Sequence, residues 1–145
     1  MTEFDSSRSG YEFFEHTADV GLRAHGLTVA ELFTHAAQGM VTLLVERNQA
    51  GSRETRTMAL QADSVDGLLR AWLKELLFWF HTDRFVPSMY HIDRVTLTEL
   101  RARVHGGTFN PDRDAPGTEI KGLTYHRFRV GHVRDGWEAE IIFDV

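Results

Sequence analysis

The apolar stripe between Val65 and Phe80 constrains the fold of this chain more than any other feature. Its members recur at three- and four-residue spacing, which is the spacing of one face of an α-helix: Val65, Leu68, Leu69, Trp72, Leu73, Leu76 and Phe80. Leu77, Phe78 and Trp79 widen this stripe, so the last turn is apolar nearly all round. Because such a helix must be covered by another element, the pattern predicts a sheet face packed against it. Ser64 is the predicted N-cap.

A second helix is predicted to begin after Thr28. Thr28 and Glu31 have the spacing of a capping box, in which the hydroxyl and the carboxylate each satisfy an amide of the first turn. The apolar residues that follow have helical spacing: Val29, Leu32, Phe33, Ala36, Ala37, Met40, Val41 and Leu44. This helix should therefore bury one face as well.

The rest of the chain reads as mostly extended. Strands are predicted at Tyr11–Phe14, Val20–His25, Arg53–Gln61, Tyr90–Thr98, Leu100–His105, Gly122–His132 and Trp137–Val145. The last two should form a hairpin around Arg134-Asp135-Gly136, whereas Gly106–Glu119 is rich in glycine and proline and is predicted as a long surface loop. Residues 1–10 are predicted to be a flexible N-terminal tail and residues 11–145 a single domain. The predicted class is α+β, with a mixed, largely antiparallel sheet and two amphipathic helices packed on it.

Composition excludes several kinds of function. The 145 residues include no cysteine, which excludes disulfides, thiol catalysis and thiolate metal sites. The net charge is −5, and no Lys/Arg cluster is dense enough for direct nucleic-acid binding. The pairs Arg101/Arg103 and Arg127/Arg129 are interpreted as solvated strand faces. No segment reaches the roughly 18 apolar residues of a membrane span, and Met1–Gly10 lacks the apolar core of a signal peptide. We expect a soluble cytoplasmic protein.

Two acids at opposite ends of the chain are the candidate site. Asp19 stands at the start of a predicted strand, and Asp144 follows the apolar run Ile141-Ile142-Phe143. We expect them to meet in space. Together with a backbone carbonyl or terminal carboxylate of Val145, they would form an oxygen ligand set that suits Ca²⁺, Mg²⁺ or Mn²⁺ rather than Zn²⁺. General acid–base chemistry remains open, as does a purely structural role in which Asp19 caps a turn and Asp144 is simply exposed.

Other catalytic patterns are missing from the sequence. The eight histidines include no His-Glu-x-x-His pair, and neither a Gly-x-Ser-x-Gly elbow nor a Gly-rich phosphate loop occurs. His16 is set apart by its closeness to Asp19. Tyr125 and His126 are neighbours on a predicted strand, where they would point to opposite faces. One of these two is therefore expected to be buried and the other to be able to join a site.

Four segments of this chain resemble the archease family. They are Phe14–Gly21 (Phe-Glu-His-Thr-Ala-Asp-Val-Gly), the Leu68–Phe80 helix, Lys121–His126 (Lys-Gly-Leu-Thr-Tyr-His) and the terminal Phe143-Asp144-Val145. The resemblance runs from about Tyr11 to Val145. It implies a small cytoplasmic protein that assists the RNA ligase RtcB in tRNA splicing, tRNA processing and RNA repair. That ligase uses GTP and Mn²⁺ to form a histidine-guanylate before it joins RNA ends. Archease speeds this guanylylation and sustains turnover without itself being the ligase.

The resemblance also implies specific site residues. The divalent-ion ligands would be Asp19, Asp144 and the backbone of Val145, with Ca²⁺ the ion expected in a structure and Mg²⁺ or Mn²⁺ as alternatives. His16, Lys121, Tyr125 and His126 would lie around the ion or contact the partner. No catalytic residue is expected, RNA would be contacted only through the ligase, and no membrane partner is implied.

Two departures from the family and two other functions stay open. Gly122 stands where the family more often has alanine, and the predicted loop Gly106–Glu119 is richer in glycine and proline than expected. A stand-alone metal-dependent phosphoester hydrolase would use Asp19 and Asp144 for the metal and His16 as base. A chaperone-like binding module would instead use the apolar end of the helix predicted over Val65–Phe80, near Trp79.

Overall fold

The computed structural model describes residues 10–16 and 19–145, without the side chain of His16. This part of the chain forms two helices, α1 (Val29–Leu44) and α2 (Val65–Asp83). Its strands are β1 (Gly10–His16), β2 (Asp19–Gly26), β3 (Val45–Arg47), β4 (Glu54–Gln61), β5 (Phe85–Val95), β6 (Glu99–Thr108), β7 (Ala115–Pro116), β8 (Gly122–Leu123), β9 (Arg129–Val133) and β10 (Gly136–Asp144). The predicted tail lies outside the described residues, except that Gly10 begins β1.

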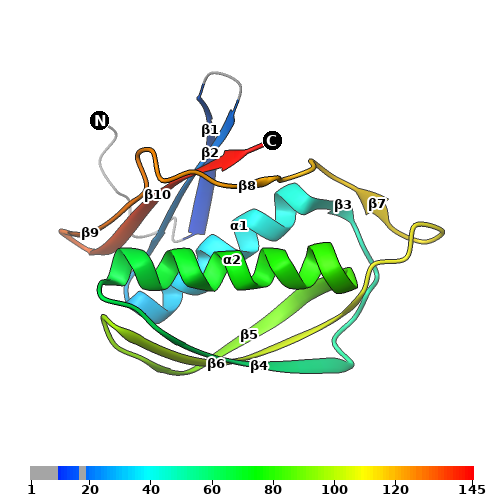
Figure 1. The fold of residues 1–145 in the computed structure, drawn as a ribbon, viewed down its shortest axis with the longest axis horizontal. Coiled ribbons are helices and arrows are strands. Elements are labelled where there is room, and N and C mark those ends of the chain that lie inside the picture. The colour runs from blue at the N-terminus through cyan, green and yellow to red at the C-terminus, as the bar shows by residue number, and fades with distance from the viewer. Residues whose placement is uncertain (1–9, 17–18) are drawn as a thin grey trace. The chain divides into compact units, whose positions relative to one another are not determined.

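The chain divides into two compact units, and the first is built from both ends of the sequence. It comprises the described residues up to Met40 together with Ile120–Val145. Its five-stranded sheet has the order β1-β2-β10-β8, and β9 also pairs with β10. In Figure 1, β10 at the red end of the chain runs beside β2 at the blue end, as their antiparallel register requires. The two ends of the described chain therefore share one sheet.

Helix α1 packs on one face of this first sheet. The hydroxyl half of the predicted capping box is confirmed, because the Glu31 amide donates to Thr28 Oγ1 at 3.1 Å. Gly39 allows close approach, since a Cβ there would lie 2.8 Å from Cδ1 of Leu22 and 3.0 Å from Cγ of Tyr11. Leu22 is completely buried on this side. Because strand residues alternate between faces, the neighbouring Arg23 belongs to the opposite face of the sheet.

The second unit, Val41–Glu119, has its own helix and sheet. Its three strands have the order β4-β6-β5, and both pairings are antiparallel. Helix α2 lies over this sheet (Figure 1) and contacts all three strands. Its predicted cap is also confirmed, because the Gly67 amide donates to Ser64 Oγ at 3.1 Å. Most of the predicted apolar stripe is buried: Leu68, Leu69, Trp72, Leu73, Leu76, Leu77 and Phe80. Val65 and Trp79 are half-buried, and Phe78 is exposed.

The predicted α+β class is confirmed, and the strands are divided among three sheets. The third sheet is the short pair β3–β7. All pairings between the described strands are antiparallel. On β6, buried Leu100, Ala102 and Val104 alternate with exposed Arg101 and Arg103, as the interpretation of a solvated face requires. No helix in the described residues is long and apolar enough to cross a bilayer.

The segment predicted as a long loop, Gly106–Glu119, is more structured than its composition indicates. Strand β6 continues to Thr108, and β7 pairs with β3. Between them the buried carboxylate of Asp114 accepts hydrogen bonds from the Gln49 amide at 2.8 Å and the Asn110 amide at 2.9 Å. Arg113 donates to the same carboxylate at 3.0 and 2.9 Å. The loop prediction is therefore wrong at the two short strand segments and holds for the residues between and after them, where Asp114 fixes the turn.

Asp114 should make the stability of this protein sensitive to acid. The hydrogen bonds from Arg113 lower its pKa well below the ordinary carboxyl range, and the amides of Asn110 and Gln49 act in the same direction against burial. A depressed folded-state pKa stabilises the fold above the unfolded pKa of roughly 4, and this contribution is lost as the pH falls further. The free energy of unfolding of wild type should exceed that of Asp114→Asn by a constant amount above about pH 5. The difference should shrink below about pH 4; urea titrations at several pH values would measure it, and a pH-independent difference would contradict the assignment.

Candidate metal and partner-binding site

Asp19 and Asp144 occupy facing ends of two paired strands. Asp19 is the first residue of β2 and Asp144 the last of β10. The antiparallel register runs to Val20 opposite Phe143, so the next two positions in register are these two acids. Residues directly opposite in such a pair share a face, with Cβ atoms roughly 4.5–5.5 Å apart. Asp144 is exposed and Asp19 half-buried, so both residues belong to one accessible corner of the sheet. We call this corner, made by Asp19 and Asp144, the acidic corner.

The other predicted residues near this corner come from β1, β8 and the end of β10. Gly122 of β8 pairs with Asp144, and the Lys121 amide donates to the carbonyl oxygen of Asp144 at 2.7 Å. His16 is at the register position opposite Asp19 on β1. Val145 directly follows Asp144 and is half-buried. The backbone therefore brings His16, Lys121 and Val145 beside the two acids.

The carboxylate and carbonyl oxygens at this corner are the kind of ligand that a hard cation prefers. Calcium and magnesium bind oxygen ligands at roughly 2.0–2.6 Å and accept carboxylates, carbonyls and water together. In the described part of the chain, no group of three or more His, Asp or Glu side chains converges as a metal site. An ion here would take the carboxylates of Asp19 and Asp144, and its remaining ligands would be backbone and water oxygens. Such a set favours Ca²⁺, Mg²⁺ or Mn²⁺ over Zn²⁺.

Tyr125 and His126 lie in a turn rather than on a strand. The predicted strand Gly122–His132 is interrupted, because β8 ends at Leu123 and β9 begins at Arg129. The prediction that one of the two side chains is buried was wrong: both are exposed, Tyr125 to 78%. A turn does not alternate its side chains between two faces, which removes the basis of that prediction. The Thr124 amide donates to the Ile142 carbonyl at 3.0 Å, so this turn adjoins β10 near Asp144.

A network of charges on the same face was missed from the sequence. Glu138 and Glu140 of β10 are only 4% and 3% exposed. Arg127 pairs with Glu140 at 2.8 Å, and Arg129 lies 3.4 Å from both acids. Arg127 and Arg129 are thus ion-paired and not simply solvated. The signal was the placement of Glu138 and Glu140 on either side of Ala139, directly before an apolar run, on a strand too buried to leave charges unpaired.

Phe14, Gly21 and Arg23 cover this face between the network and the acidic corner. Phe14 is directly opposite Gly21 on the paired strand, and a Cβ on Gly21 would lie 2.2 Å from Cε2 of Phe14. The Arg23 guanidinium is 5.0 Å from the centre of the Phe14 ring. Burial opposes its charge, but the hydrogen bond from Arg23 to Glu12 and the nearby charges of Glu140, Glu12 and Glu138 raise its pKa. The Phe14 ring therefore packs against Gly21, with the Arg23 guanidinium over it.

Gly21→Ala should displace the Phe14 ring and destabilise the first unit. Overpacking a closely packed position costs typically about 1–3 kcal/mol. The loss should appear as a lower urea midpoint with unchanged slope. Gly131→Ala is the matched control on β9, because a Cβ there would meet only the end of the Arg129 side chain at 3.8 Å. Equal effects of the two substitutions would contradict the role given to the Phe14–Gly21 contact.

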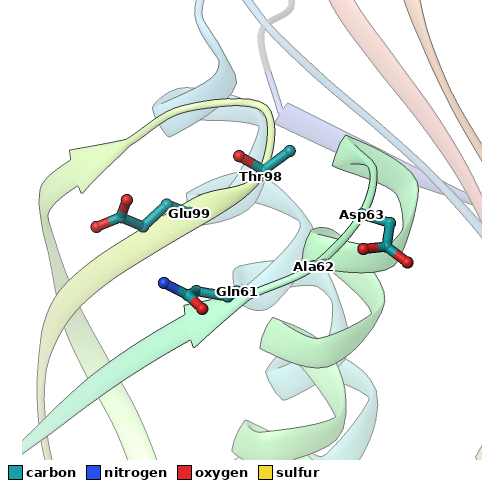
Figure 2. A pocket seen from close by; sticks show the side chains of 5 residues that line it. All are labelled: Gln61, Ala62, Asp63, Thr98 and Glu99. Atoms are coloured by element: carbon teal, nitrogen blue, oxygen red, sulfur yellow. The ribbon is translucent and has the colours of Figure 1, made fainter.

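An open pocket in the second unit does not provide an alternative site. It has a volume of about 290 Å³ and is lined by Gln61, Ala62, Asp63, Thr98 and Glu99. Figure 2 shows the carboxyl groups of Asp63 and Glu99 on opposite sides of Gln61, pointing apart. They do not converge on one ligand atom. None of the residues predicted for the site lines this pocket.

The fold defines a class of small α+β protein in which the first described strands and the last strand form one sheet, with Asp19 and Asp144 at neighbouring strand ends. The chain belongs to the archease family: the model of the archease protein family (MTH1598/TM1083) matches residues 11–145. This confirms the family resemblance and the extent predicted for it.

Relatives and solved structures agree with this assignment. Protein archease of Methanosarcina acetivorans is 30% identical over 139 residues, covering 93% of this chain and 95% of its own length. Protein archease of Thermococcus kodakarensis is 31% identical over 140 residues, covering 93% and 98%. The solution structure of protein 1598 of Methanobacterium thermoautotrophicum has a TM-score of 0.79 at 26% identity, covering 94% of this chain and 99% of its own. A crystal structure from Thermotoga maritima, described as an archease and possible chaperone, has the same fold, with a TM-score of 0.66 at 20% identity over 91% and 94% of the two chains.

Proposed function

We propose that this protein activates the RNA ligase RtcB by promoting its guanylylation and multiple turnover, through a divalent cation held between Asp19 and Asp144. The observation that carries the proposal is the register of β2 and β10, which brings the two acids from opposite ends of the chain to facing positions. Membership of the archease family supports the choice of partner. The protein acts as a cofactor of the ligase in the cytoplasm, in tRNA splicing and RNA repair, and is not itself an enzyme.

Charge supports an encounter of this kind. The chain carries a net charge of −5, whereas a ligase channel that handles GTP and RNA must be positive. Opposite charge speeds and orients association. When bound, the cation would supply positive charge to phosphate oxygens. Asp19, Asp144 and the backbone of Val145 would hold it, and the exposed side chain of Lys121 would meet phosphate or partner groups beside it.

The test is to incubate the cognate ligase with GTP and Mn²⁺, with and without this protein, and to follow formation of the ligase–guanylate in a single turnover. We expect faster guanylylation and more ligation cycles in the presence of this protein. In the same experiment the protein alone is offered phosphoester and nucleotide substrates. Hydrolysis without the ligase, together with no effect on the ligase, would contradict the proposal and favour the stand-alone hydrolase.

One observation favours a second candidate, a chaperone-like binding module. Phe78 in the last turns of α2 is 57% exposed, although Leu76, Leu77 and Phe80 around it are buried. An exposed aromatic residue on a helix can bind an apolar partner segment. Stimulation of the ligase that survives EDTA pretreatment of this protein, with Mn²⁺ resupplied only to the ligase, but is lost in Phe78→Ser would favour this function over the shared cation.

A further inference from the structure

The turn between β8 and β9, Thr124–Phe128, has an ordered and unusual shape. We call this segment the β8–β9 turn. Arg127 has a φ of 60°, in the left-handed region that non-glycine residues avoid. Three hydrogen bonds fix the neighbouring backbone: Thr124 amide to Ile142 carbonyl at 3.0 Å, Phe128 amide to Tyr125 carbonyl at 3.3 Å, and Thr124 Oγ1 to His126 carbonyl at 3.3 Å. An unfavourable backbone conformation of this kind persists only where its surroundings hold it.

The group that holds Arg127 is a buried acid. The Nη2 atom of Arg127 lies 2.8 Å from Oε1 of Glu140, and Glu140 is 3% exposed. Arg23 and Arg129 also approach Glu140, at 3.6 and 3.4 Å. Of the three cations, Arg127 is closest and is the one that belongs to the turn. The Arg127–Glu140 pair therefore fastens the turn to the middle of β10.

The same geometry places the turn beside the acidic corner. Glu140 and Asp144 are four residues apart on β10, so they share a face of the sheet. The turn directly follows β8, and Gly122 of β8 pairs with Asp144. Tyr125 projects from it with 78% of its surface exposed. A large aromatic residue on a rigid element loses little entropy on binding, and tyrosine is enriched among the residues that dominate protein interfaces.

We propose that the Arg127–Glu140 ion pair is a latch that holds the β8–β9 turn in its binding shape, so that Tyr125 enters an apolar slot on the partner protein. This inference rests on the proposed function, and the partner is the RNA ligase. Tyr125 is a contact residue, and Arg127 and Glu140 are positioning residues.

The first arm of the test uses the protein alone and measures order in the turn. Arg127→Ala, Arg127→Gly and Glu140→Gln should each raise the rate of chymotrypsin cleavage after Tyr125 at least about tenfold. Arg127→Gly is the decisive variant, because glycine accepts the left-handed backbone but cannot make the ion pair. Arg103→Ala is the control, since it breaks an ion pair with Asp93 of the same 2.8 Å length in the other unit. Thermal melts establish that each variant is folded. Unchanged cleavage in Arg127→Gly and Glu140→Gln would overturn the latch.

The second arm measures how strongly each variant stimulates the partner, the RNA ligase. The concentration of this protein that gives half-maximal ligase guanylylation should rise at least about tenfold for Tyr125→Ala, Arg127→Gly and Glu140→Gln. The maximal rate at saturation should stay near wild type, and Arg103→Ala should change neither quantity. Tyr125→Ala tests the contact separately from folding, because the side chain is exposed. A wild-type half-maximal concentration for Tyr125→Ala would overturn the contact.

The two proposals fail in different ways. Loss of the shared cation should lower the maximal rate, whereas loss of the latch should raise the half-maximal concentration. If Asp19→Asn and Asp144→Asn stimulate normally while the latch variants bind weakly, the cation is refuted and the latch stands. If wild type neither binds nor stimulates the ligase, the proposed function fails and the contact assigned to Tyr125 fails with it. The cleavage arm then decides the latch by itself.

Discussion

Asp19→Asn and Asp144→Asn should each reduce stimulation of ligase guanylylation by at least about tenfold. Changing groups that merely orient a metal ligand costs roughly 10- to 100-fold in metal affinity or activity, so removing one charge from a direct ligand should cost no less. Asparagine keeps the size of the side chain and one of its oxygens, which isolates the charge. The measurement is single-turnover guanylylation at saturating concentrations of this protein, where the maximal rate is read directly.

Matched controls make this result specific. Asp93→Asn neutralises an exposed acid in the second unit, where it forms an ion pair with Arg103, so stimulation should be unchanged. The double variant Asp19→Asn/Asp144→Asn should lose little more than either single variant, because both remove the same ion. Full stimulation by both single variants, confirmed as folded, would contradict the shared cation. Two independent and additive losses would instead indicate separate contacts with the ligase.

Trp72→Ala should have the largest effect on stability, a loss of about 3–5 kcal/mol in the free energy of unfolding. Trp72 is completely buried on α2, and its ring centre is 6.0 Å from that of Tyr90 on β5 in an edge-on arrangement. Truncation leaves a cavity between helix and sheet that the surrounding side chains fill only partly. A loss of this size is a large share of the 5–15 kcal/mol typical of a whole protein.

Urea unfolding followed by far-ultraviolet circular dichroism would measure this loss. Phe78→Ala is the control on the same helix, because Phe78 is 57% exposed and its truncation leaves no cavity. The expected cost there is below about 1 kcal/mol. Comparable losses from Trp72→Ala and Phe78→Ala would show that the α2 stripe does not pack as described.

Local sequence signals were sufficient for the helices. Thr28 and Ser64 cap the two helices where predicted, because a capping hydroxyl acts on amides only three residues away. The spacing of the apolar residues in α2 likewise predicted which face of the helix is buried. The Asp-Gly turn before β10 was predicted for the same reason, and β9 and β10 pair around it. Division of the strands among three sheets is not a local property and came only from the structure.

Predictions failed where a distant residue decides the local conformation. Gly122–His132 reads as a continuous strand, but the chain turns at Arg127, which has a positive φ and forms an ion pair with Glu140. Gly106–Glu119 reads as a loop, but Asp114 accepts hydrogen bonds from the Gln49 amide across 65 positions of sequence. Both cases depend on a buried carboxylate whose partners lie in another element. Neither partner could be recognised from spacing alone.

The candidate site was predicted only in part from the sequence. The identities of Asp19 and Asp144 stand out in the sequence, because each is an acid beside an apolar strand. Their positions depend on the pairing of the first and last thirds of the chain, and the β2–β10 register puts them at neighbouring strand ends. The surrounding charges of Arg23, Glu138 and Glu140 were not predicted, because only the paired strands bring them onto one face.

The most direct test of the shared cation is a crystal structure of this protein grown with Mn²⁺ and measured at a wavelength where manganese scatters anomalously. We predict an anomalous peak within about 2.0–2.6 Å of a carboxylate oxygen of Asp19 and of one from Asp144, and no such peak in Asp144→Asn crystals grown in the same way. Carboxylates that turn away from each other at saturating Mn²⁺, with no peak between them, would contradict the account.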